Sequence, residues 1–425
     1  MIKFIHAADI HLDSCESRGL VEYDGAPIEG CRRATRRALE NLVQLAINEQ
    51  VHFVLIAGDI YDGDWKDART GLFFISQLNR LRDAKINCYM IRGNHDAASE
   101  ISRHLPLPVN RDETPMLLGH DRCETIILED IGVAIHGRGF KTRAVTENLA
   151  ATYAVRIPGM HNIGLLHTCM DGAEGHEPYS PCSRLELLAK EYEYWALGHI
   201  HLRSPPVVDD ICPILFSGNL QGRHVRECGP KGAYLVEFSS GAPQITFHPL
   251  AVYRWEVCTL DITNLTTDDE LWSAFSDAIG RLIQPHDLPV AARIEISGCT
   301  SLHQTLYDRL PTVIDQFKSL GISASNSRLW LEDVRLKTRP PSRLVEAWHD
   351  DGPLGELTRF MDQLQLNSQK FKELARPLIE MTRLLPPGIV GGGTLQPDDE
   401  TWLSDVLEDV RPLLINRLSG SGEDR

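Results

Sequence analysis

Two histidines separated by one residue, His199 and His201, end an apolar run in the segment WALGHIHLRS. The run predicts a β-strand that ends at Leu197, and Gly198 follows it with the backbone freedom needed for a sharp turn. Because alternate side chains share a face, both imidazoles should point to one side. Two solvated histidines on a surface loop would give the same pattern, so a shared ligand site depends on matching residues elsewhere.

Four further motifs carry metal-ligating residue types, and each follows a predicted strand. They are DIH at 9–11, GDIYD at 58–62, GNHD at 93–96 and the histidine that ends NIGLLH, His167. In open α/β sheets the carboxyl ends of the strands form the ligand crevice, so side chains far apart in the sequence can converge there. DxH or GDxxD alone is typical of a turn or a helix cap, whereas the five motifs together favour one site.

The five motifs offer more nitrogen and oxygen ligands than one divalent cation takes. Two cations that share a bridging carboxylate would use all of them, and Asp59 is the expected bridge. Such a pair suits the hydrolysis of phosphate esters, because it lowers the pKa of water and offsets negative charge on the phosphoryl and leaving oxygens. The expected metal ligands are Asp9, His11, Asp59, Asn94, His167, His199 and His201.

One histidine of the GNHD motif, His95, follows Asn94 and is not needed as a ligand. We expect His95 to be catalytic, either as the proton donor to the leaving oxygen or as a contact that holds the phosphoryl group. Asp96 is expected to assist catalysis by orienting the His95 ring. The motif therefore supplies both a metal ligand and an acid–base group.

The predicted fold class is α/β, with two packed sheets flanked by helices over residues 1–250. Short β-rich runs alternate there with amphipathic helical patterns, which indicates β-α-β crossovers. Residues 251–340 predict a small α+β domain with its own sheet and with a helix over 301–317, closed by Pro340 and Pro341. Residues 341–425 have helical periodicity and end in a segment expected to be a flexible tail.

The composition excludes several classes of protein. The 425 residues carry a net charge of −16, which argues against affinity for nucleic acid based on a bulk positive field, although a local basic face or a bound metal pair could still hold phosphate. The ten cysteines form no CxxC pair and are expected to be reduced thiols. Neither a signal peptide nor a membrane-spanning run is recognisable, so we expect a cytoplasmic protein with no membrane partner.

The order DxH, GDxxD, GNH[DE], H and GHxH resembles the signature of the calcineurin-like metallophosphoesterases. The segments AADIHLDS, EPYSPCS, YWALGHIH and SGNLQGRHVRECGPKG are similar to those of bacterial DNA repair exonucleases of the SbcD and YhaO type. This resemblance covers most of the first 250 residues, and beyond Tyr253 it is an agreement of layout only. Ser217 departs from the family pattern, which usually has proline at this position.

The resemblance implies a catalytic domain with two manganese ions. It places Asp9, His11, Asp59 and His201 on one ion, and Asp59, Asn94, His167 and His199 on the other. It also implies that residues 251–340 form a capping domain that gates DNA access, and that residues 341–425 dock on an SMC-like ABC-type ATPase. Three residues near the site, in the segment GRHVRE, are expected substrate contacts: Arg223, His224 and Arg226.

The function expected from these features is a metal-dependent DNA exonuclease, with endonuclease activity included, that acts in DNA repair or recombination. Two alternatives stay open. A small-molecule phosphodiesterase or phosphatase could use the same dinuclear centre, because the fold does not dictate the substrate. A DNA-end tether or ATPase adaptor would need no hydrolysis, but the intact ligand set weighs against it. The sequence also leaves open whether the chain forms a homodimer.

Overall fold

The structure is a computed structural model of the 425-residue chain. It describes residues 1–14, 33–62, 67–99, 105–172, 177–207, 210–239, 241–284, 288–340, 352–366 and 368–382, and a few positions between 402 and 414. Its contacts divide the chain into two compact units, Met1–Glu256 and Val257–Arg425. The predicted boundary between the first two domains, at residue 250, falls close to this division.

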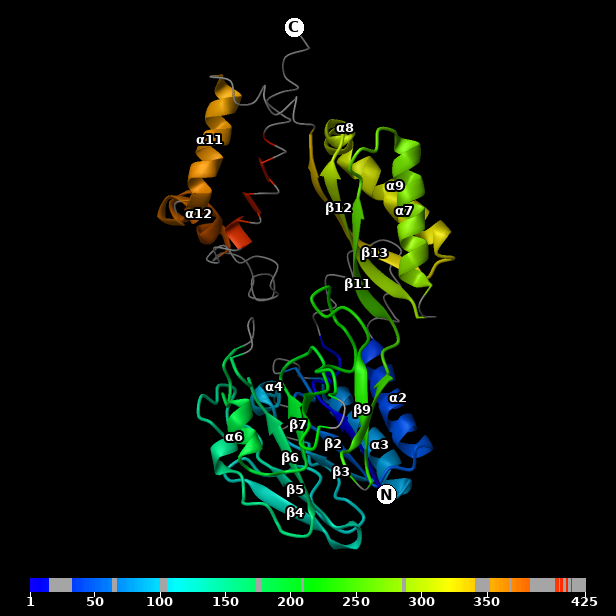
Figure 1. The fold of residues 1–425 in the computed structure, drawn as a ribbon, viewed down its shortest axis with the longest axis vertical. Helices are drawn as coiled ribbons and strands as arrows, with labels where there is room; N and C mark the ends of the chain where they lie inside the picture. Colours follow the sequence, from blue (N-terminus) through cyan, green and yellow to red (C-terminus); the bar gives the residue numbers. More distant parts are fainter. Residues whose placement is uncertain are drawn as a thin grey trace. The chain divides into compact units, whose positions relative to one another are not determined.

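The first sheet of the first unit has the strand order β10-β9-β1-β2-β3. Three of its strands, β1, β2 and β3, run parallel, while β9 lies antiparallel to β1, and β10 antiparallel to β9. Parallel neighbours have their carboxyl ends at the same edge, which fixes where loop residues of β1, β2 and β3 emerge. The strands are β1 Ile2–Ala7, β2 Phe53–Ile56, β3 Asn87–Met90, β9 Gly232–Phe238 and β10 Gln244–Pro249 (Figure 1).

The second sheet has the order β4-β5-β6-β7-β8. Strands β5 to β8 are parallel, and β4 forms an antiparallel edge with β5. A left-handed glycine, Gly132 with φ of 63°, closes the turn between β4 and β5. The strands are β4 Glu124–Leu128, β5 Val133–Gly137, β6 His161–His167, β7 Tyr194–Gly198 and β8 Ile214–Phe216.

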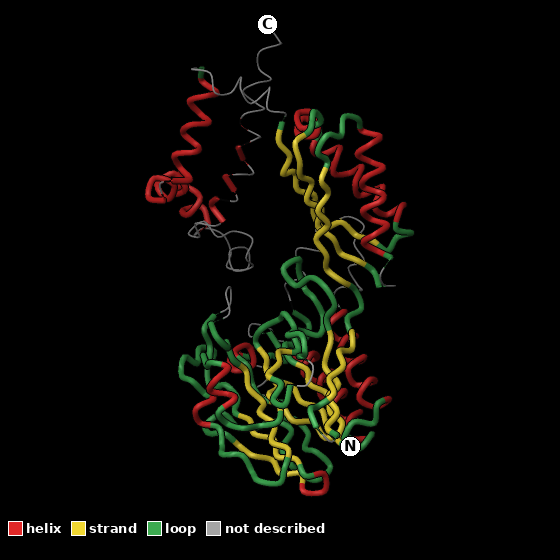
Figure 2. Tube along the Cα trace, viewed as in Figure 1, coloured by secondary structure: helices red, strands yellow, loops and turns green. Residues whose placement is uncertain are grey.

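Alternation along β2 shows how the two sheets pack. Phe53 and Leu55 are buried in a cluster shared with residues of β6 and β7, whereas Val54 and Ile56 are buried in a cluster shared with α2 and α3. The Phe4 ring of β1 stacks on Phe53 with 5.0 Å between ring centroids. Burial of each large apolar side chain stabilises the sandwich by roughly 1.5–3 kcal/mol. Two packed sheets flanked by helices were expected, and this expectation is confirmed (Figure 2).

The helices of the first unit are short or amphipathic. The apolar stripe of α2 and that of α3 cover the outer face of the first sheet. Asp67 caps α3, because its side chain accepts a hydrogen bond from the Arg69 backbone N–H at 2.9 Å. The helices are α2 Ala34–Asn48, α3 Ala68–Asp83, α4 Asn94–Ala98 and α6 Arg184–Leu188, with 3₁₀ turns η2 Glu129–Ile131 and η3 Ala150–Thr152.

The second unit begins with a three-stranded sheet of order β11-β12-β13, whose core includes residues of α7 and α9. Phe275 of α7 and Phe317 of α9 meet edge to face, with ring centroids 4.6 Å apart. The helix expected over 301–317 is instead two helices, because Pro311 lies in the first turn of α9 and cannot continue α8. The elements are β11 Arg254–Asp261, α7 Asp268–Ile283, β12 Val290–Cys299, α8 His303–Asp308, α9 Leu310–Ala324 and β13 Leu329–Arg339.

Two further helices lie in the region that was expected to be helical, α11 Pro353–Leu366 and α12 Ser368–Thr382. Met361 and Leu364 of α11 are buried in a small cluster with Leu407. The expected flexible tail at the end of the chain lies outside the described residues. Among the helices that the structure does describe, none combines the length and the apolar character that crossing a bilayer requires.

Gly164 of β6 provides a test of the packing in the second sheet. A Cβ at this position would lie 2.2 Å from the ring of Trp195, which is fully buried and cannot move aside. We therefore expect Gly164→Ala to lower the free energy of unfolding by about 1–3 kcal/mol, measured by chemical denaturation. Gly280→Ala is the control, because a Cβ there meets nothing within 4 Å inside α7, and alanine should stabilise that helix by about 0.5–1 kcal/mol. Equal effects at the two glycines would contradict this packing.

Candidate metal centre

Every expected metal ligand follows or ends a strand of the two-sheet sandwich. Asp9 and His11 follow β1, Asp59 follows β2, and Asn94 follows β3. The other three come from the second sheet, in which His167 is the last residue of β6, and His199 and His201 follow β7. The pairing of β1 with β2 and of β6 with β7 is parallel, so the ligands emerge together at the carboxyl edges. The convergence expected from the five motifs therefore has a topological cause.

Several ligands have a backbone conformation that residues other than glycine seldom adopt. The φ angles of Asp9, His11 and Asp59 are 50°, 44° and 52°, and φ of His199 is 100°. Backbone strain of this kind costs about 1–3 kcal/mol per residue and persists only where the surroundings impose it. Here the N–H of Asp9 donates to the Gly58 carbonyl at 3.0 Å, which ties the β1 loop to the β2 loop. The two loops thus hold each other in the conformation that turns the ligands inward.

Glycines allow the ligand loops to approach one another. A Cβ on Gly198 would lie 2.0 Å from the Ala57 carbonyl oxygen, and a Cβ on Gly93 would lie 2.2 Å from Oδ1 of Asp59. Any side chain at these positions would push the loops apart, because the Cβ would clash with a backbone carbonyl in one case and with a ligand carboxylate in the other. Gly198 and Gly93, which directly precede His199 and Asn94, are therefore required because no larger residue fits.

One group of ligand atoms consists of Asp9, His11 and His201, whose ligand atoms all lie within 4.8 Å of one another. The Nε2 atoms of His11 and His201 face each other at 3.1 Å. Two ring nitrogens aimed at one point are typical of imidazoles that share a cation. This group contains three of the four residues that the resemblance placed on the first metal ion, without Asp59.

A second group consists of Asp9, Asp59 and His167, again within 4.8 Å. Oδ1 of Asn94 lies 3.0 Å from Nε2 of His167, which adds an amide oxygen to the group. Oδ2 of Asp59 lies 3.5 Å from Nε2 of His167 and 3.9 Å from Nε2 of His11. Oδ2 of Asp59 thus lies between one histidine of each group, while Asp9 belongs to both groups, and the bridging role of Asp59 stays a prediction.

His199 joins this arrangement through its backbone and its ring. Its N–H donates to both carboxylate oxygens of Asp9, at 3.0 and 3.1 Å. Nε2 of the ring donates to the Glu177 carbonyl oxygen at 2.9 Å, so in this tautomer Nδ1 is the nitrogen that can bind a cation. The His199 ring lies edge to face with His167, with centroids 5.2 Å apart.

The outer ring nitrogen of each remaining histidine ligand is held by an oxygen. Nδ1 of His11 lies 2.6 Å from Asp62, and Nδ1 of His201 lies 2.7 Å from Glu227. Nδ1 of His167 lies 2.9 Å from the Ala57 carbonyl oxygen. An Nδ1–H that donates outward fixes the tautomer in which the Nε2 lone pair points inward, as a metal ligand requires. Asp62 and Glu227 were not assigned roles from the sequence, although Asp62 is the second aspartate of the GDxxD motif.

The charges in the site favour a bound cation. Burial raises the pKa of Asp59, but His167, His95 and His11 outweigh it and hold this pKa well below its usual range. Burial lowers the pKa of His167, whereas Asp59 and Asp9 raise it to about 9. The buried carboxylates thus draw positive charge into the site. Carboxylate, imidazole and amide donors that converge in two groups on a shared aspartate fit two divalent cations.

His95 lies at the accessible edge of this site. Its side chain is 32% exposed, and its ring stands edge to face with that of His11, with centroids 4.9 Å apart. Nδ1 of His95 lies 3.6 Å from Oδ1 of Asp62, and its backbone N–H donates to Asp59 at 2.9 Å. Burial lowers the pKa of His95, and Asp59 and Asp62 oppose that shift only in part. His95 is placed where it can contact a substrate held by the metal ligands.

Asp96 has a different role from the one expected. Its carboxylate accepts hydrogen bonds from the backbone N–H groups of Ile60, Tyr61 and Gly93, at 2.9, 3.0 and 3.1 Å. It therefore fastens the loop after β2 to the start of α4, and the carboxylate placed beside the His95 ring is that of Asp62. Sequence proximity suggested the pairing with His95, but backbone donors from a neighbouring strand take up the Asp96 oxygens.

The three expected substrate contacts differ in their exposure. Arg223 is buried, and its guanidinium contacts Glu227 at 2.8 Å and lies 3.6 Å from Asp62. His224 is partly exposed, and Arg226 is exposed. Arg223 is thus part of the protein interior around the ligands, whereas a substrate contact at His224 or Arg226 stays a prediction.

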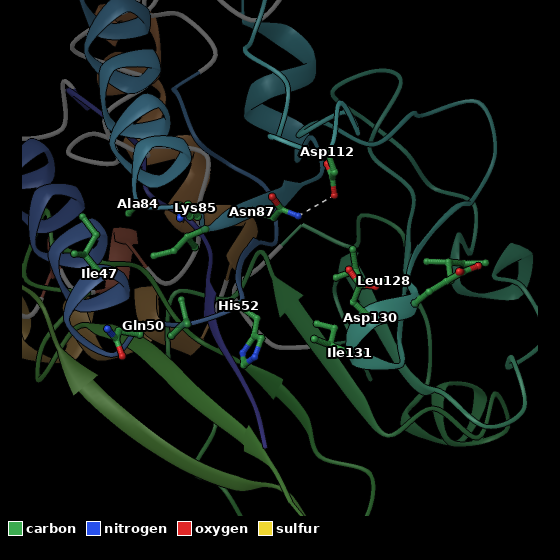
Figure 3. Close-up of a pocket in the computed structure, with 14 residues that line it drawn as sticks. Ile47, Gln50, His52, Ala84, Lys85, Asn87, Asp112, Leu128, Asp130 and Ile131 are labelled. Atoms are coloured by element: carbon green, nitrogen blue, oxygen red, sulfur yellow. Dashed lines mark hydrogen bonds between the residues drawn. The ribbon is translucent and has the colours of Figure 1, made fainter.

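A separate hollow of about 750 Å³ lies at the other ends of the first-sheet strands (Figure 3). Val51 and His52 precede β2, and Ile86 and Asn87 stand at the start of β3, so this hollow faces away from the carboxyl edge. Asn87 donates to Asp112 at 3.0 Å across its wall. None of the expected site residues lines it.

The sequence is similar to known metallophosphoesterases over most of its length. Residues 2–203 match the family model described as calcineurin-like phosphoesterase, and residues 255–339 match the middle domain of metallophosphoesterase YhaO. The uncharacterized metallophosphoesterase YhaO of Bacillus subtilis is 31% identical over 417 residues, which cover 96% of this chain and 89% of that protein. The chain belongs to the calcineurin-like metallophosphoesterase family. The family resemblance and the α/β fold expected from the sequence are therefore confirmed.

More distant metallophosphoesterase relatives carry a functional name. The DNA double-strand break repair protein Mre11 of Saccharolobus solfataricus is 26% identical over 277 residues, covering 63% of this chain and 68% of that protein. The protein of the same name from Sulfolobus acidocaldarius is 23% identical over 350 residues, covering 80% of this chain and 86% of that protein. This chain is thus a metallophosphoesterase, a hydrolase whose family uses a dinuclear divalent metal centre, with relatives among DNA repair proteins.

Substitution of Asp59 tests the shared carboxylate. We expect Asp59→Ala, and its isostere Asp59→Asn, to lose both metal ions, because Oδ2 of Asp59 lies between Nε2 of His11 and Nε2 of His167, one histidine from each ligand group. Elemental analysis after gel filtration measures the metal content. Asp121→Ala is the control, since the Asp121 side chain is 72% exposed and belongs to neither group. Retention of both ions by Asp59→Asn would contradict a bridging role.

The raised pKa of His167 predicts a pH dependence. Without metal, the His167 imidazole is protonated below a pH of about 9, and a cation can bind Nε2 only after this proton leaves. Metal affinity should therefore rise by up to about tenfold per pH unit from neutral pH and level off above a pH of about 9. Calorimetry in buffers of different ionisation enthalpy should detect the released proton.

The metal-free chain should show the opposite trend in stability. A folded-state pKa above the unfolded value of 6.5 stabilises the chain fully below that value, and this stabilisation is lost as the pH rises through about 9. Metal affinity that does not change over this interval would contradict the assignment of His167 as a ligand.

Proposed function

We propose that this metallophosphoesterase is a two-metal-dependent DNA nuclease, an exonuclease with endonuclease activity included, that acts in DNA repair or recombination. The observation that carries the proposal is the pair of adjacent ligand groups that share Asp9 and have the Asp59 carboxylate between their histidines, with His95 at the accessible edge. The resemblance to proteins named for DNA double-strand break repair supports DNA as the substrate. We further propose Mn²⁺ as the metal and the cytoplasm as the location.

The chain's own residues would divide the work of hydrolysis. A bound pair of divalent cations supplies the activation of water and the neutralisation of phosphoryl charge. Asp9, His11, Asp59, Asn94, His167, His199 and His201 would hold that pair. His95 would contact the phosphoryl group or donate a proton to the leaving oxygen, because its ring is exposed beside the ligands. Asp62, at 3.6 Å from Nδ1, would steady the ring.

The proposal also assigns a role to each of the two parts of the second unit. We propose that its α+β domain gates access of DNA to the site and that the helices after residue 341 dock on an SMC-like ABC-type ATPase. Leu374, Leu378 and Met381 of α12 are 56%, 39% and 60% exposed and recur at spacings of four and three, which places them on one helix face. Exposed apolar residues in such a stripe are typical of a helix that binds a partner.

The net charge of −16 favours one alternative, a small-molecule phosphodiesterase or phosphatase with the same centre. The two functions differ in substrate only. We expect turnover of linear duplex DNA in the presence of Mn²⁺ to exceed turnover of a chromogenic phosphodiester, and addition of the ATPase to increase the DNA reaction. Turnover of the chromogenic substrate without any DNA cleavage would favour the alternative.

His95→Ala tests the catalytic assignment. We expect DNA hydrolysis to fall by about 10²–10⁴-fold, because a positioned acid–base group is lost, while metal content and DNA binding are retained. His120→Ala is a matched control, since the His120 side chain is 34% exposed, close to the 32% of His95, and belongs to none of the ligand groups. Full turnover by His95→Ala would remove His95 from the mechanism.

A further inference from the structure

A closed circuit of contacts joins two histidine ligands through three charged residues. Nδ1 of His11 lies 2.6 Å from Oδ1 of Asp62, and that same oxygen lies 3.6 Å from the Arg223 guanidinium. The guanidinium donates to Oε1 of Glu227 at 2.8 Å, and Oε1 lies 2.7 Å from Nδ1 of His201. The circuit closes where the Nε2 atoms of His201 and His11 face each other at 3.1 Å.

The charged side chains of this circuit are largely buried, which strengthens the electrostatic interactions between them. The side chains of Arg223 and Glu227 are only 6% and 3% exposed, and that of Asp62 is 17% exposed. Two carboxylates brought close together in such a site repel each other, and a guanidinium between them offsets that repulsion. The planar guanidinium also donates hydrogen bonds in fixed directions, whereas a lysine ammonium group supplies the charge without this fixed geometry. Arg223 thus sets the separation of the two carboxylates that orient His11 and His201.

Glu227 is itself held from several sides. Its Oε2 accepts from the backbone N–H of Arg223 and from the Asn219 side-chain amide, both at 2.8 Å. Lys231, four residues further along, donates from Nζ to the backbone carbonyl of His201 at 2.8 Å. One segment of the chain, residues 219–231, therefore forms hydrogen bonds with both the ring and the backbone of His201.

The described contacts of His167 and Asn94 in the second ligand group are of another kind. His167 is oriented by the backbone carbonyl of Ala57 at 2.9 Å, and Asn94 contributes from the first turn of α4. Neither contact involves Arg223 or Glu227. Removal of the circuit should therefore disturb one metal site and spare the other.

We propose that Arg223 and Glu227 are positioning residues that build the metal site of Asp9, His11 and His201 and leave the site of Asn94 and His167 unaffected. The inference rests on the two-metal centre of the proposed function and not on the identity of the substrate. It replaces the expected substrate contact at Arg223 with a role in the interior. Arg223 bridges the two carboxylates that orient His11 and His201, so one metal site depends on a residue that does not itself bind a metal ion.

The test measures Mn²⁺ binding by calorimetry and metal content in the full-length chain. The native chain should bind two ions. Arg223→Met should weaken one of the two sites by at least about tenfold, the usual effect of losing an outer hydrogen-bond partner, and change the other by less than about threefold. Arg223→Lys should recover only part of the loss, because a lysine cannot contact both carboxylates with a rigid fork.

Glu227→Gln provides a second variant, because glutamine keeps the shape of glutamate and so keeps the packing if Arg223→Met fails to fold. It should also weaken one site selectively. Arg156→Lys is the matched control, since the Arg156–Glu193 pair at 2.7 Å lies at the opposite ends of β6 and β7. Circular dichroism and thermal unfolding check that each variant is folded.

A double-substitution cycle identifies the affected site. Arg223→Met should have no further effect on metal binding in a His201→Ala background, because the dependent site is already lost, and its full effect in a His167→Ala background. Equal weakening of both sites by Arg223→Met or Glu227→Gln, or unchanged binding, would overturn the inference while the two-metal centre stands. A native chain that binds no metal would overturn the proposed function and this inference together.

Discussion

A buried carboxylate surrounded by imidazoles is the interaction on which the rest of the site depends. Asp59 is 2% exposed and has ring nitrogens of His167 and His11 at 3.5 and 3.9 Å. A buried charge without partners would cost several kcal/mol, so these neighbours and a cation are what make its ionised form tolerable. The loops around it have their strained geometry for the same reason, because the ligands must approach from two sheets. The hydrolytic chemistry of the family follows from that concentration of negative charge.

The sequence predicted most of the fold, and it singled out candidate ligands that the structure brings close together, because strands and their loops leave local traces. Apolar runs that end in Asp-x-His or Gly-Asp mark a strand and the loop after it, and parallel pairing brings such loops together. Pro311 explains why a single expected helix is two, and a closer reading of proline could have found that break. The layered fold was thus accessible from pattern alone.

The outer contacts of the site were not accessible in this way. Asp96 follows His95 directly, yet its oxygens accept from the backbone N–H groups of Gly93, three residues earlier, and of Ile60 in the loop after β2, and only the tertiary fold brings the second donor near. Arg223 lies in a basic segment that resembles a phosphate contact, but Glu227 in the same segment neutralises it in the interior. Contacts between the loops of different strands, such as that of Asp62 with the His11 ring, leave no spacing in the sequence.

The left-handed backbone of Asp9, His11 and Asp59 links folding to metal supply. Strain at three neighbouring positions lowers the stability of these loops when cations are absent. Binding returns that free energy, so the loaded chain resists unfolding and proteolysis more than the empty one. The amount of intact protein in a cell would then follow the available divalent metal, and the metallophosphoesterase would be scarce wherever its own chemistry could not proceed.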